Sequence, residues 1–347
     1  MDKKLPSDDS NPHLNGHAAL VLAPFSEEAL KALKRLLRVT HESWTDTRKL
    51  YSPDDLSRRL NDEGFSVLVV EADFVFEEVF QGASGLKMLG VCRSNVNNVN
   101  LEAATEHGVA VVNTPARNAQ GVAELTIGMM ISLARGICDH DMYVKNGKWE
   151  SPVEPYISMR GVELKGKTLG IIGLGSIGTI VARLSRAFGM RVLAYDPWAE
   201  VKRAPKGTAL LETLEEVLQG ADFLSVHASN SPYTVGLLNR HRLSLMKPGA
   251  YILNTAAYPI IEEAALVEGL QSGRIAGAAL DVHRTHPITP TSPLLKLKNV
   301  VLAPHIGGAT DGTIERQSWI MVDEIGRFLR GTRPRHLVNR DIWRHRG

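Results

Sequence analysis

A glycine-rich run in the middle of the chain has the spacing of a phosphate-binding turn. Gly173, Gly175 and Gly178 follow the apolar run 168–172, and the residues after them have the pattern of a helix. In such a turn we expect Gly173 to permit a tight bend and Gly175 to let the backbone approach a diphosphate. We expect Gly178 to let the new helix pack closely on the strand. The spacing therefore predicts the entrance of a dinucleotide-binding fold.

Two further features near this run point to the same ligand. The backbone amides of Ser176 and Ile177 lie at the expected start of the helix, where unpaired N–H groups bind phosphate. Asp196 follows the next apolar run, at about the distance that places an acid beside the adenosine ribose. Its negative charge would repel a 2′-phosphate, so the sequence predicts NAD as the cofactor.

The elements that position this turn alternate between strand-like and helix-like segments. Because parallel strands need helical crossovers, this alternation predicts an α/β fold with doubly wound parallel sheets covered on both faces. Ten apolar runs predict strands: 17–24, 65–72, 87–93, 109–114, 168–172, 191–195, 222–228, 250–255, 276–282 and 299–303. The last six of them match a doubly wound dinucleotide-binding sheet.

Helix starts and apolar faces predict the segments between these strands. Ser26 and Ser52 stand where a serine side chain caps open amides, and Pro53 suits a first helical position. Apolar spacing from Asn118 to Ile137 predicts a long helix, and the following residues 147–152 read as a loop. The other expected helices are 100–107, 212–218, 262–271 and 313–329.

Composition excludes several classes of protein. The chain has 347 residues, of which 44% are hydrophobic, and this is enough for two domains. Its net charge of +2 argues against direct binding of nucleic acid, and no window is apolar enough for a membrane span. The two cysteines, Cys92 and Cys138, favour a reduced, cytoplasmic protein. Residues 1–16 are polar, contain no secretory signal and are expected to form a disordered tail.

Beyond these patterns, the chain resembles the D-isomer-specific 2-hydroxyacid dehydrogenases, the family that includes D-3-phosphoglycerate dehydrogenase. The resemblance runs from about residue 17 to residue 340. It is carried by these stretches in family order: NLEAATEHGVAVVNTP, VAELTIGMMISLAR, ELKGKTLGIIGLGSIGTIVARLSRAFGMRVLAYDP, LMKPGAYILNTA, GRIAGAALDV and NVVLAPHIGGAT.

This resemblance implies an architecture of two Rossmann-like or flavodoxin-like domains with the active-site cleft between them. The substrate (catalytic) domain would be discontinuous and comprise residues 17–116 plus 310–340. The NAD-binding Rossmann domain would comprise residues 117–309. The family resemblance also implies a homodimer that pairs through the NAD domain, and a small 2-oxo or 2-hydroxy acid as the substrate.

The family's site positions can be carried over by residue. His227, Thr255, Ala256 and Asp281 stand where the family contacts NAD, with Asp281 near the carboxamide. The proton-shuttling histidine of the family is His305 in this chain. The family's substrate loop corresponds to Arg93, Ser94, Asn95 and Val96, where family members usually carry glycine.

Two catalytic positions depart from the family pattern. The arginine that binds the substrate carboxylate should follow Ala256, but Ala257 and then Tyr258 stand there. The glutamate that pairs with the histidine is replaced by His286. A charge-assisted bond to a carboxylate contributes roughly 1.5–3 kcal/mol, and a carboxylate raises the pKa of a neighbouring histidine, whereas a second histidine does not.

These residues are compatible with three functions. The first is an active oxidoreductase in which His305 and His286 share the proton, with Arg93 or Arg284 in place of the missing guanidinium. The second is an NAD-binding sensor or partner-binding protein with little or no catalysis. The third is a different NAD-dependent reaction on an unusual substrate. The spacing of His283, His286 and His305 is not that of a metal site, so no metal is expected.

Overall fold

A computed structural model of the chain describes residues 16–200 and 204–343, so the expected tail lies almost wholly outside the described residues. The chain divides into two compact units. Among the described residues, unit 1 comprises residues 16–117 and 311–343, and unit 2 comprises residues 118–200 and 204–310. These bounds lie within one residue of the junctions that the family resemblance implies.

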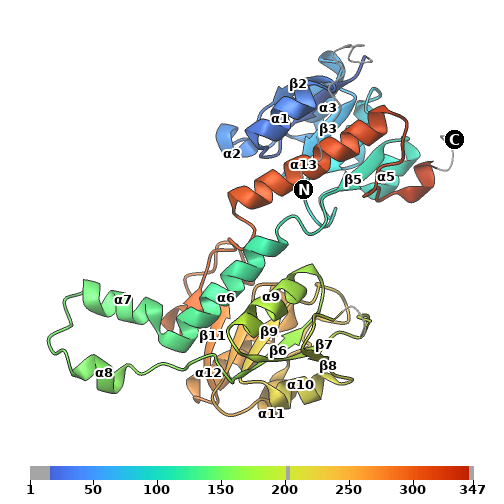
Figure 1. Cartoon of the computed structure of the whole chain (residues 1–347). Coiled ribbons are helices and arrows are strands. Elements are labelled where there is room, and N and C mark those ends of the chain that lie inside the picture. Colours follow the sequence, from blue (N-terminus) through green and yellow to red (C-terminus); the bar gives the residue numbers. More distant parts are fainter. Residues whose placement is uncertain (1–15, 201–203, 344–347) are drawn as a thin grey trace. The chain divides into compact units, whose positions relative to one another are not determined.

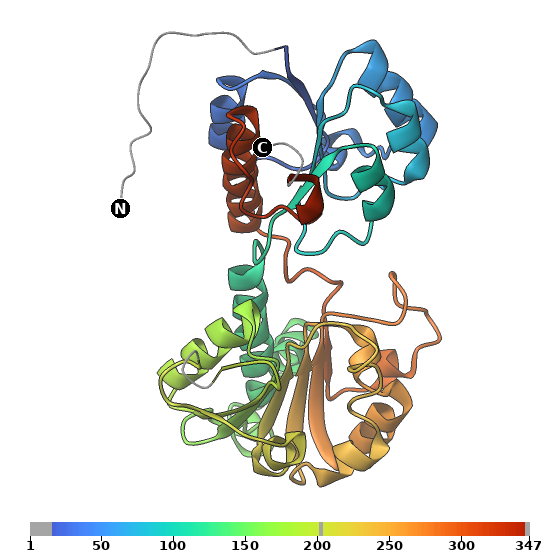
Figure 2. The same ribbon diagram turned by 90° about the vertical axis from the view of Figure 1, so that its right-hand side faces the viewer.

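Unit 1 is built on a five-stranded sheet in the order β2-β1-β3-β4-β5. All of its strand pairs are parallel, and the order is that of flavodoxin-like folds. Its elements are β1 (Ala18–Val21), α1 (Glu27–Lys34), β2 (Arg38–His41), α2 (Trp44–Thr47), α3 (Pro53–Asp62), β3 (Val67–Val70), α4 (Glu77–Gly82), β4 (Met88–Val91), α5 (Leu101–Glu106), β5 (Ala110–Asn113), α13 (Asp311–Leu329) and the 3-10 helix η4 (Arg340–Trp343). The returning helix α13 lies beside α1 (Figures 1 and 2).

Unit 2 holds a seven-stranded parallel sheet in the order β12-β11-β10-β9-β6-β7-β8. This is the order of a dinucleotide-binding sheet with one added strand at its edge. Its elements are α6 (Ala119–Arg135), α7 (Ile137–Lys145), α8 (Glu154–Ser158), β6 (Thr168–Ile172), α9 (Ser176–Ala187), β7 (Arg191–Tyr195), β8 (Thr208–Leu210), α10 (Leu214–Gly220), β9 (Phe223–Val226), α11 (Arg240–Leu245), β10 (Ala250–Asn254), η2 (Tyr258–Ile260), α12 (Glu263–Gln271), β11 (Ile275–Leu280), η3 (Pro293–Lys296) and β12 (Val300–Leu302).

Along each strand, alternate side chains point to opposite faces of the sheet, and they pack in a separate hydrophobic core on each face. In β1, Ala18 and Leu20 pack in one cluster, whereas Ala19 and Val21 pack in another on the opposite face. The strands of unit 2 divide between two clusters in the same way. Helices cover both faces of the sheet in Figure 2, which explains why these strands read as continuous apolar runs.

The structure corrects three details of the sequence prediction. Ser26 does not cap α1 with its side chain; its backbone amide instead donates to the hydroxyl of Ser318. The expected helix through Ile137 breaks at Gly136, whose left-handed backbone ends α6 before α7 begins. Each sheet has one strand more than the sequence predicted, β2 in unit 1 and β8 in unit 2, because neither of these edge strands carries an apolar run.

Helices α7 and α8 extend away from the body of unit 2 as an arm, residues 137–158 (Figure 1). No single helix within the described residues is long and apolar enough to cross a membrane. The pair α6 and α7, bent by 64° at its break, meets the length and composition criteria together. Much of α6 is buried in the core of unit 2, which accounts for its apolar composition.

Candidate functional site

The turn between β6 and α9 needs its glycines for steric reasons. Gly173 has a φ of 90°, and a Cβ there would lie 2.7 Å from the amide nitrogen of Ala228. A Cβ on Gly178 would lie 2.1 Å from the carbonyl oxygen of Gly173. Any side chain at these two positions would push the turn, the helix and β9 apart.

The start of α9 is open to a ligand. Its N-cap is Gly175, so no side chain bonds the first amides of this 12-residue helix. A Cβ on Gly175 would have no neighbour within 4 Å, which means that the space over the turn is free. The amides of Ser176 and Ile177 lie in the first turn of this helix. A diphosphate fits such a position because the helix N-terminus carries partial positive charge.

Asp196 follows β7 and faces the same turn. Its Oδ2 accepts a hydrogen bond from the amide of Leu174 at 2.8 Å, and its Oδ1 accepts one from the amide of Trp198 at 3.0 Å. A carboxylate has about four lone-pair sites, so each oxygen can still accept a second bond. The acid is therefore held in place and remains able to bind ribose hydroxyls.

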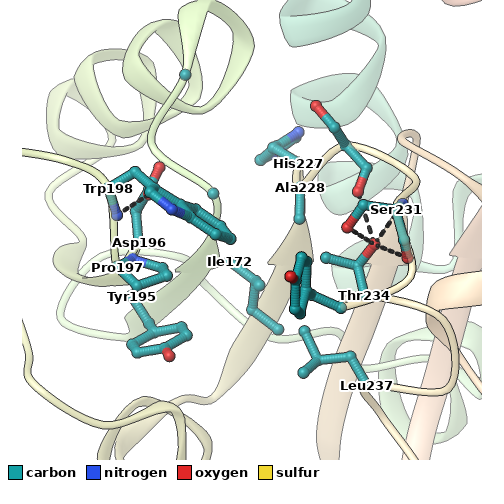
Figure 3. A pocket seen from close by; sticks show the side chains of 14 residues that line it. Ile172, Tyr195, Asp196, Pro197, Trp198, His227, Ala228, Ser231, Thr234 and Leu237 are labelled. Atoms are coloured by element: carbon teal, nitrogen blue, oxygen red, sulfur yellow. Dashed lines mark hydrogen bonds between the residues drawn. The ribbon is translucent and has the colours of Figure 1, made fainter.

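A pocket of about 550 Å³ lies between the turn and the segment that follows β9. Figure 3 shows Asp196, Pro197 and Trp198 on one wall, and Thr234 and Leu237 on the other. Trp198 and Tyr233 are large exposed aromatic side chains that also line the pocket. An apolar pocket with few polar groups suits an adenosine, whose base has two flat apolar faces.

His227 forms part of the same pocket wall. Its Nε2 lies 2.8 Å from the hydroxyl of Ser225, and its Nδ1 is buried without a hydrogen-bond partner among the described residues. Burial lowers the pKa of His227 to about 3, so the ring is neutral at physiological pH. A buried nitrogen without a partner is uncommon in folded proteins, so this atom marks the wall of the pocket as a place where polar groups are not fully satisfied by the protein itself.

A second cluster of residues lies at the carboxyl ends of β11 and β12. Asp281 is only 1% exposed, and it accepts hydrogen bonds from the amides of Ile306 and Gly307, each at 2.8 Å. His305 stands next to these amides with a φ of 58°, in the left-handed region that few non-glycine residues adopt. The carboxylate of Asp281 therefore fixes the loop that presents His305.

His305 and His286 are in direct contact. Nδ1 of His305 lies 3.1 Å from Nε2 of His286, and both rings are exposed. Burial of part of the ring and the neighbouring His305 and His283 lower the pKa of His286, while Asp281 opposes them. Within the described residues, no group of three or more His, Cys, Asp or Glu is placed to hold a metal ion.

The residues after β10 are held by the side chains of Asn254 and Thr255. Asn254 Oδ1 accepts from the amides of Ala256 and Ala257, and the buried hydroxyl of Thr255 lies 2.9 Å from that of Thr126. Tyr258 begins η2 immediately beyond this segment.

Electrostatics connect Tyr258 with one of the candidate cations. Burial and the nearby Glu263 raise the pKa of Tyr258, and Arg284 opposes them. Arg284 thus lies within electrostatic range of the position that follows Ala257. It is the candidate cation that shares unit 2 with His305 and His286.

The substrate-loop residues belong to unit 1, at the carboxyl end of β4. The carbonyl oxygen of Arg93 accepts from the amide of Thr114, and that of Ser94 accepts from the side chain of Asn113. Asn95 is exposed and Val96 packs partly against the core of unit 1. Arg93 as a residue is half-buried, and its guanidinium makes no ion pair within residues 16–200 and 204–343.

Comparison with known proteins shows to which family the chain belongs. The model of the D-isomer specific 2-hydroxyacid dehydrogenase NAD-binding domain matches residues 127–307. The chain belongs to this family. It is 36% identical over 92% of its length to a D-3-phosphoglycerate dehydrogenase of Archaeoglobus fulgidus, and 35% identical over 91% of its length to a glyoxylate reductase of Thermofilum pendens.

The relatives differ in how much of their length is matched. The chain spans 59% of the A. fulgidus protein and 92% of the T. pendens protein. A crystal structure of a protein from Thermus thermophilus superposes with a TM-score of 0.80 at 36% identity, covering 92% of this chain and 99% of that one. These matches confirm the family and the α/β fold that the sequence predicted.

The cofactor of this chain is a nicotinamide dinucleotide, as its family membership establishes and as the open turn before α9 fits. Three residues at the dinucleotide pocket were not singled out from the sequence as site residues. Trp198 and Tyr233 line the pocket, and Ser225 bonds His227. Only the place of Trp198, two residues beyond Asp196, could have indicated its role.

Proposed function

We propose that this protein catalyses NAD-dependent oxidation and reduction between a 2-hydroxy acid and a 2-oxo acid at a rearranged catalytic site. The observation that carries the proposal is the 3.1 Å contact between His305 Nδ1 and His286 Nε2, on a loop that a buried carboxylate holds in place. The cofactor, when bound, accepts or supplies the hydride at C2 of the substrate.

The proton moves through His305 in this proposal. Its Nδ1 is used by His286, which leaves Nε2 as the nitrogen that faces the substrate hydroxyl. In the oxidative direction the O–H bond breaks, its electrons form the carbonyl, and the proton passes to Nε2. His286 shares the proton through the contact at Nδ1.

A cation must replace the missing arginine at Ala257, because the substrate carries a carboxylate. Arg93 is a half-buried residue on the loop after β4, and its guanidinium makes no ion pair among the described residues, which supports this role. Arg284 supports it by its electrostatic influence on Tyr258. We propose that Arg93, Ser94, Asn95 and Val96 form the substrate loop, with Arg93 as the carboxylate ligand because it is the less exposed of the two cations.

A panel of 2-oxo acids with NADH, and of 2-hydroxy acids with NAD, tests the proposal. We expect turnover that His305→Ala reduces by roughly 10²–10⁴-fold, the usual contribution of a general acid or base. His241→Ala is the matched control, since this histidine is exposed on α11 of the same unit. Turnover that survives His305→Ala unchanged would remove His305 from the mechanism.

A second function is favoured by the two replaced residues. Ala257 and His286 remove a cation and an anion from the family's catalytic set, while the features that bind the dinucleotide are kept. A protein with this combination could act as an NAD-responsive sensor or partner-binding module. Saturable NADH binding with no turnover across the panel, and none after Ala257→Arg with His286→Glu, would favour it.

We also propose that the chain forms a homodimer through unit 2 and acts in the cytoplasm. The arm carries seven large apolar side chains that are exposed in the single chain: Ile137, Met142, Val144, Trp149, Val153, Tyr156 and Ile157. Burying such a surface against a second copy is favourable by about 25 cal/mol per Å². Light scattering should give twice the chain mass of 38.0 kDa, and Trp149→Glu with Tyr156→Glu should give the monomer.

A further inference from the structure

Two aromatic side chains line the dinucleotide pocket and have no partner of their own. Trp198 is 75% exposed and Tyr233 is 81% exposed, yet both line the pocket of about 550 Å³. Among the large apolar side chains that the structure describes, only Tyr156 on the arm is as exposed. Single exposed apolar residues are ordinary on a protein surface, but two at the same pocket point to a ligand that covers them.

Trp198 is tied to the acid that stands at the ribose position. Its backbone amide donates to Oδ1 of Asp196 at 3.0 Å, and Pro197 between them restricts the backbone. Figure 3 shows these three residues together on one wall of the pocket. Because the base of a nucleoside is bonded directly to its ribose, a ribose held by Asp196 brings the base within reach of the indole of Trp198.

Thr234 fixes the turn that carries Tyr233 on the other side of the pocket. The hydroxyl of Thr234 donates to the carbonyl oxygen of Ser229 at 2.7 Å and accepts from the amide of Ser231 at 2.9 Å. Thr234 is only 7% exposed, so its side chain points into the protein. The neighbouring Tyr233 is therefore left to point outward, which accounts for its exposure on a turn that is itself held in place.

The sheet sets the distance between the two sides of the pocket. Trp198 follows β7 and Tyr233 follows β9, and β6 lies between these two strands in the sheet. Neighbouring strands lie about 4.8 Å apart, so β7 and β9 are separated by about 10 Å. A flat base stacked between two rings needs about 7 to 8 Å, since carbon atoms in contact lie about 3.5–4.0 Å apart. The spacing of the strands therefore leaves room for one base between the two aromatic side chains.

We propose that Trp198 and Tyr233 form an aromatic clamp that holds the adenine of the dinucleotide by its two faces. Ile172 and Ala228 lie between the two walls in Figure 3 and add apolar contact. Aromatic rings bind a nucleobase by stacking, which needs no hydrogen bond to the edge of the base. The clamp sets the affinity for the cofactor and takes no part in hydride or proton transfer. The inference therefore goes beyond the proposed function and does not depend on it.

The first test measures binding of ADP-ribose, which carries the adenosine and the diphosphate but no nicotinamide. Calorimetry with the full chain should show that Trp198→Leu and Tyr233→Leu each weaken its binding by about 5- to 100-fold, the range for stacking of a base on an aromatic ring. Trp198→Phe and Tyr233→Phe should recover most of this loss, because each keeps a ring. Phe188→Leu is the matched control, since Phe188 is an exposed aromatic residue at the far end of α9 and does not line the pocket. Affinities of both leucine variants within about twofold of the native value would overturn the clamp.

The second test distinguishes stacking from mere support of the pocket wall. Aromatic rings above and below an adenine shift the signals of its H2 and H8 protons upfield. Proton NMR of ADP-ribose bound at saturation should show this shift with the native protein, a smaller shift with each leucine variant, and almost none with the double variant. Weaker binding with an unchanged upfield shift would overturn the clamp, because the two rings would then not lie on the base. Neither test involves turnover, so the clamp can be confirmed even if the proposed dehydrogenase activity is absent.

Discussion

Replacing Asp281 by alanine should release the loop that carries His305. The carboxylate is buried, and its two oxygens accept from the amides of Ile306 and Gly307 at 2.8 Å. The loop also holds His305 in a left-handed conformation, which costs roughly 1–2 kcal/mol for a residue with a side chain. Without the two bonds, only the bonds within the loop, such as that from the amide of Ala309 to the carbonyl oxygen of Ile306, oppose this cost, and the loop is expected to open more often.

The size of the effect follows from the surroundings of the two amides. A hydrogen bond to a charged group contributes about 1.5–3 kcal/mol. Ile306 is 44% exposed, so water can replace part of its bond, whereas Gly307 is buried and its amide would remain unsatisfied. We therefore expect local destabilisation of about 2–4 kcal/mol, which corresponds to roughly 30- to 1000-fold faster opening.

Hydrogen exchange read by mass spectrometry on a peptide covering residues 303–310 measures this opening directly. The matched control is Asp323→Ala, which removes an exposed carboxylate that lies 3.6 Å from Arg335. The exchange rate of Asp281→Asn should lie between that of Asp281→Ala and that of the native protein, because an asparagine amide offers only one acceptor oxygen. Exchange in Asp281→Ala within a factor of about three of the native rate would show that these bonds do not hold the loop.

Measurements on the cofactor pocket, on pH dependence and on the thiols give further tests. Asp196→Ala should weaken NADH binding by about 10–100-fold, the effect of losing about 1.5–3 kcal/mol, and an unchanged fluorescence titration would reject the ribose contact. The folded state holds His227 in its neutral form, because its pKa there is about 3. Its contribution to the free energy of unfolding should therefore be fully present above pH 6.5 and be lost as the pH falls towards 3. When urea unfolding is measured across this pH range, His227→Gln should lose less of its free energy of unfolding than the native protein. Curves of unfolding free energy against pH that run parallel for the two proteins would contradict this. A thiol reagent should label Cys138 quickly and Cys92 hardly at all, because burial raises the pKa of Cys92 and hides it; Cys138→Ser should abolish the fast reaction.

The sequence predicted those strands whose residues form an apolar run. Strands buried on both faces appear as apolar stretches: β3 is a continuous run of valine and leucine, and β6 has three large apolar residues beside Thr168 and Gly170. Two of the edge strands lack this pattern: β2 (Arg38–His41) is partly exposed along its length, and β8 has only three residues. Their pairing depends on neighbouring strands that local patterns do not reveal.

The site was predictable where it depends on backbone geometry. The steric need for Gly173 and Gly178 follows from spacing alone, and the structure shows the atoms that a side chain would strike. The bonds of Asp281 to the loop amides join residues 25 and 26 positions apart, and the contact of His286 with His305 joins residues 19 apart. Such contacts follow from the way β11 and β12 end side by side, which only the folded chain shows.

The two replaced catalytic positions should be coupled, because their charges have opposite sign. Ala257 removes a positive charge and His286 removes a negative one, so the net charge of the family's catalytic set is preserved. Ala257→Arg alone adds a cation near the histidine pair and disfavours its protonation, while His286→Glu alone adds an anion that repels the substrate carboxylate. We therefore expect the change in kcat/KM of the double variant, relative to the native protein, to exceed the product of the changes in the two single variants by about tenfold or more. This corresponds to an interaction free energy of about 1.4 kcal/mol. Single effects that simply multiply would show that the two positions act independently, and that a cation elsewhere, such as Arg93, already binds the carboxylate.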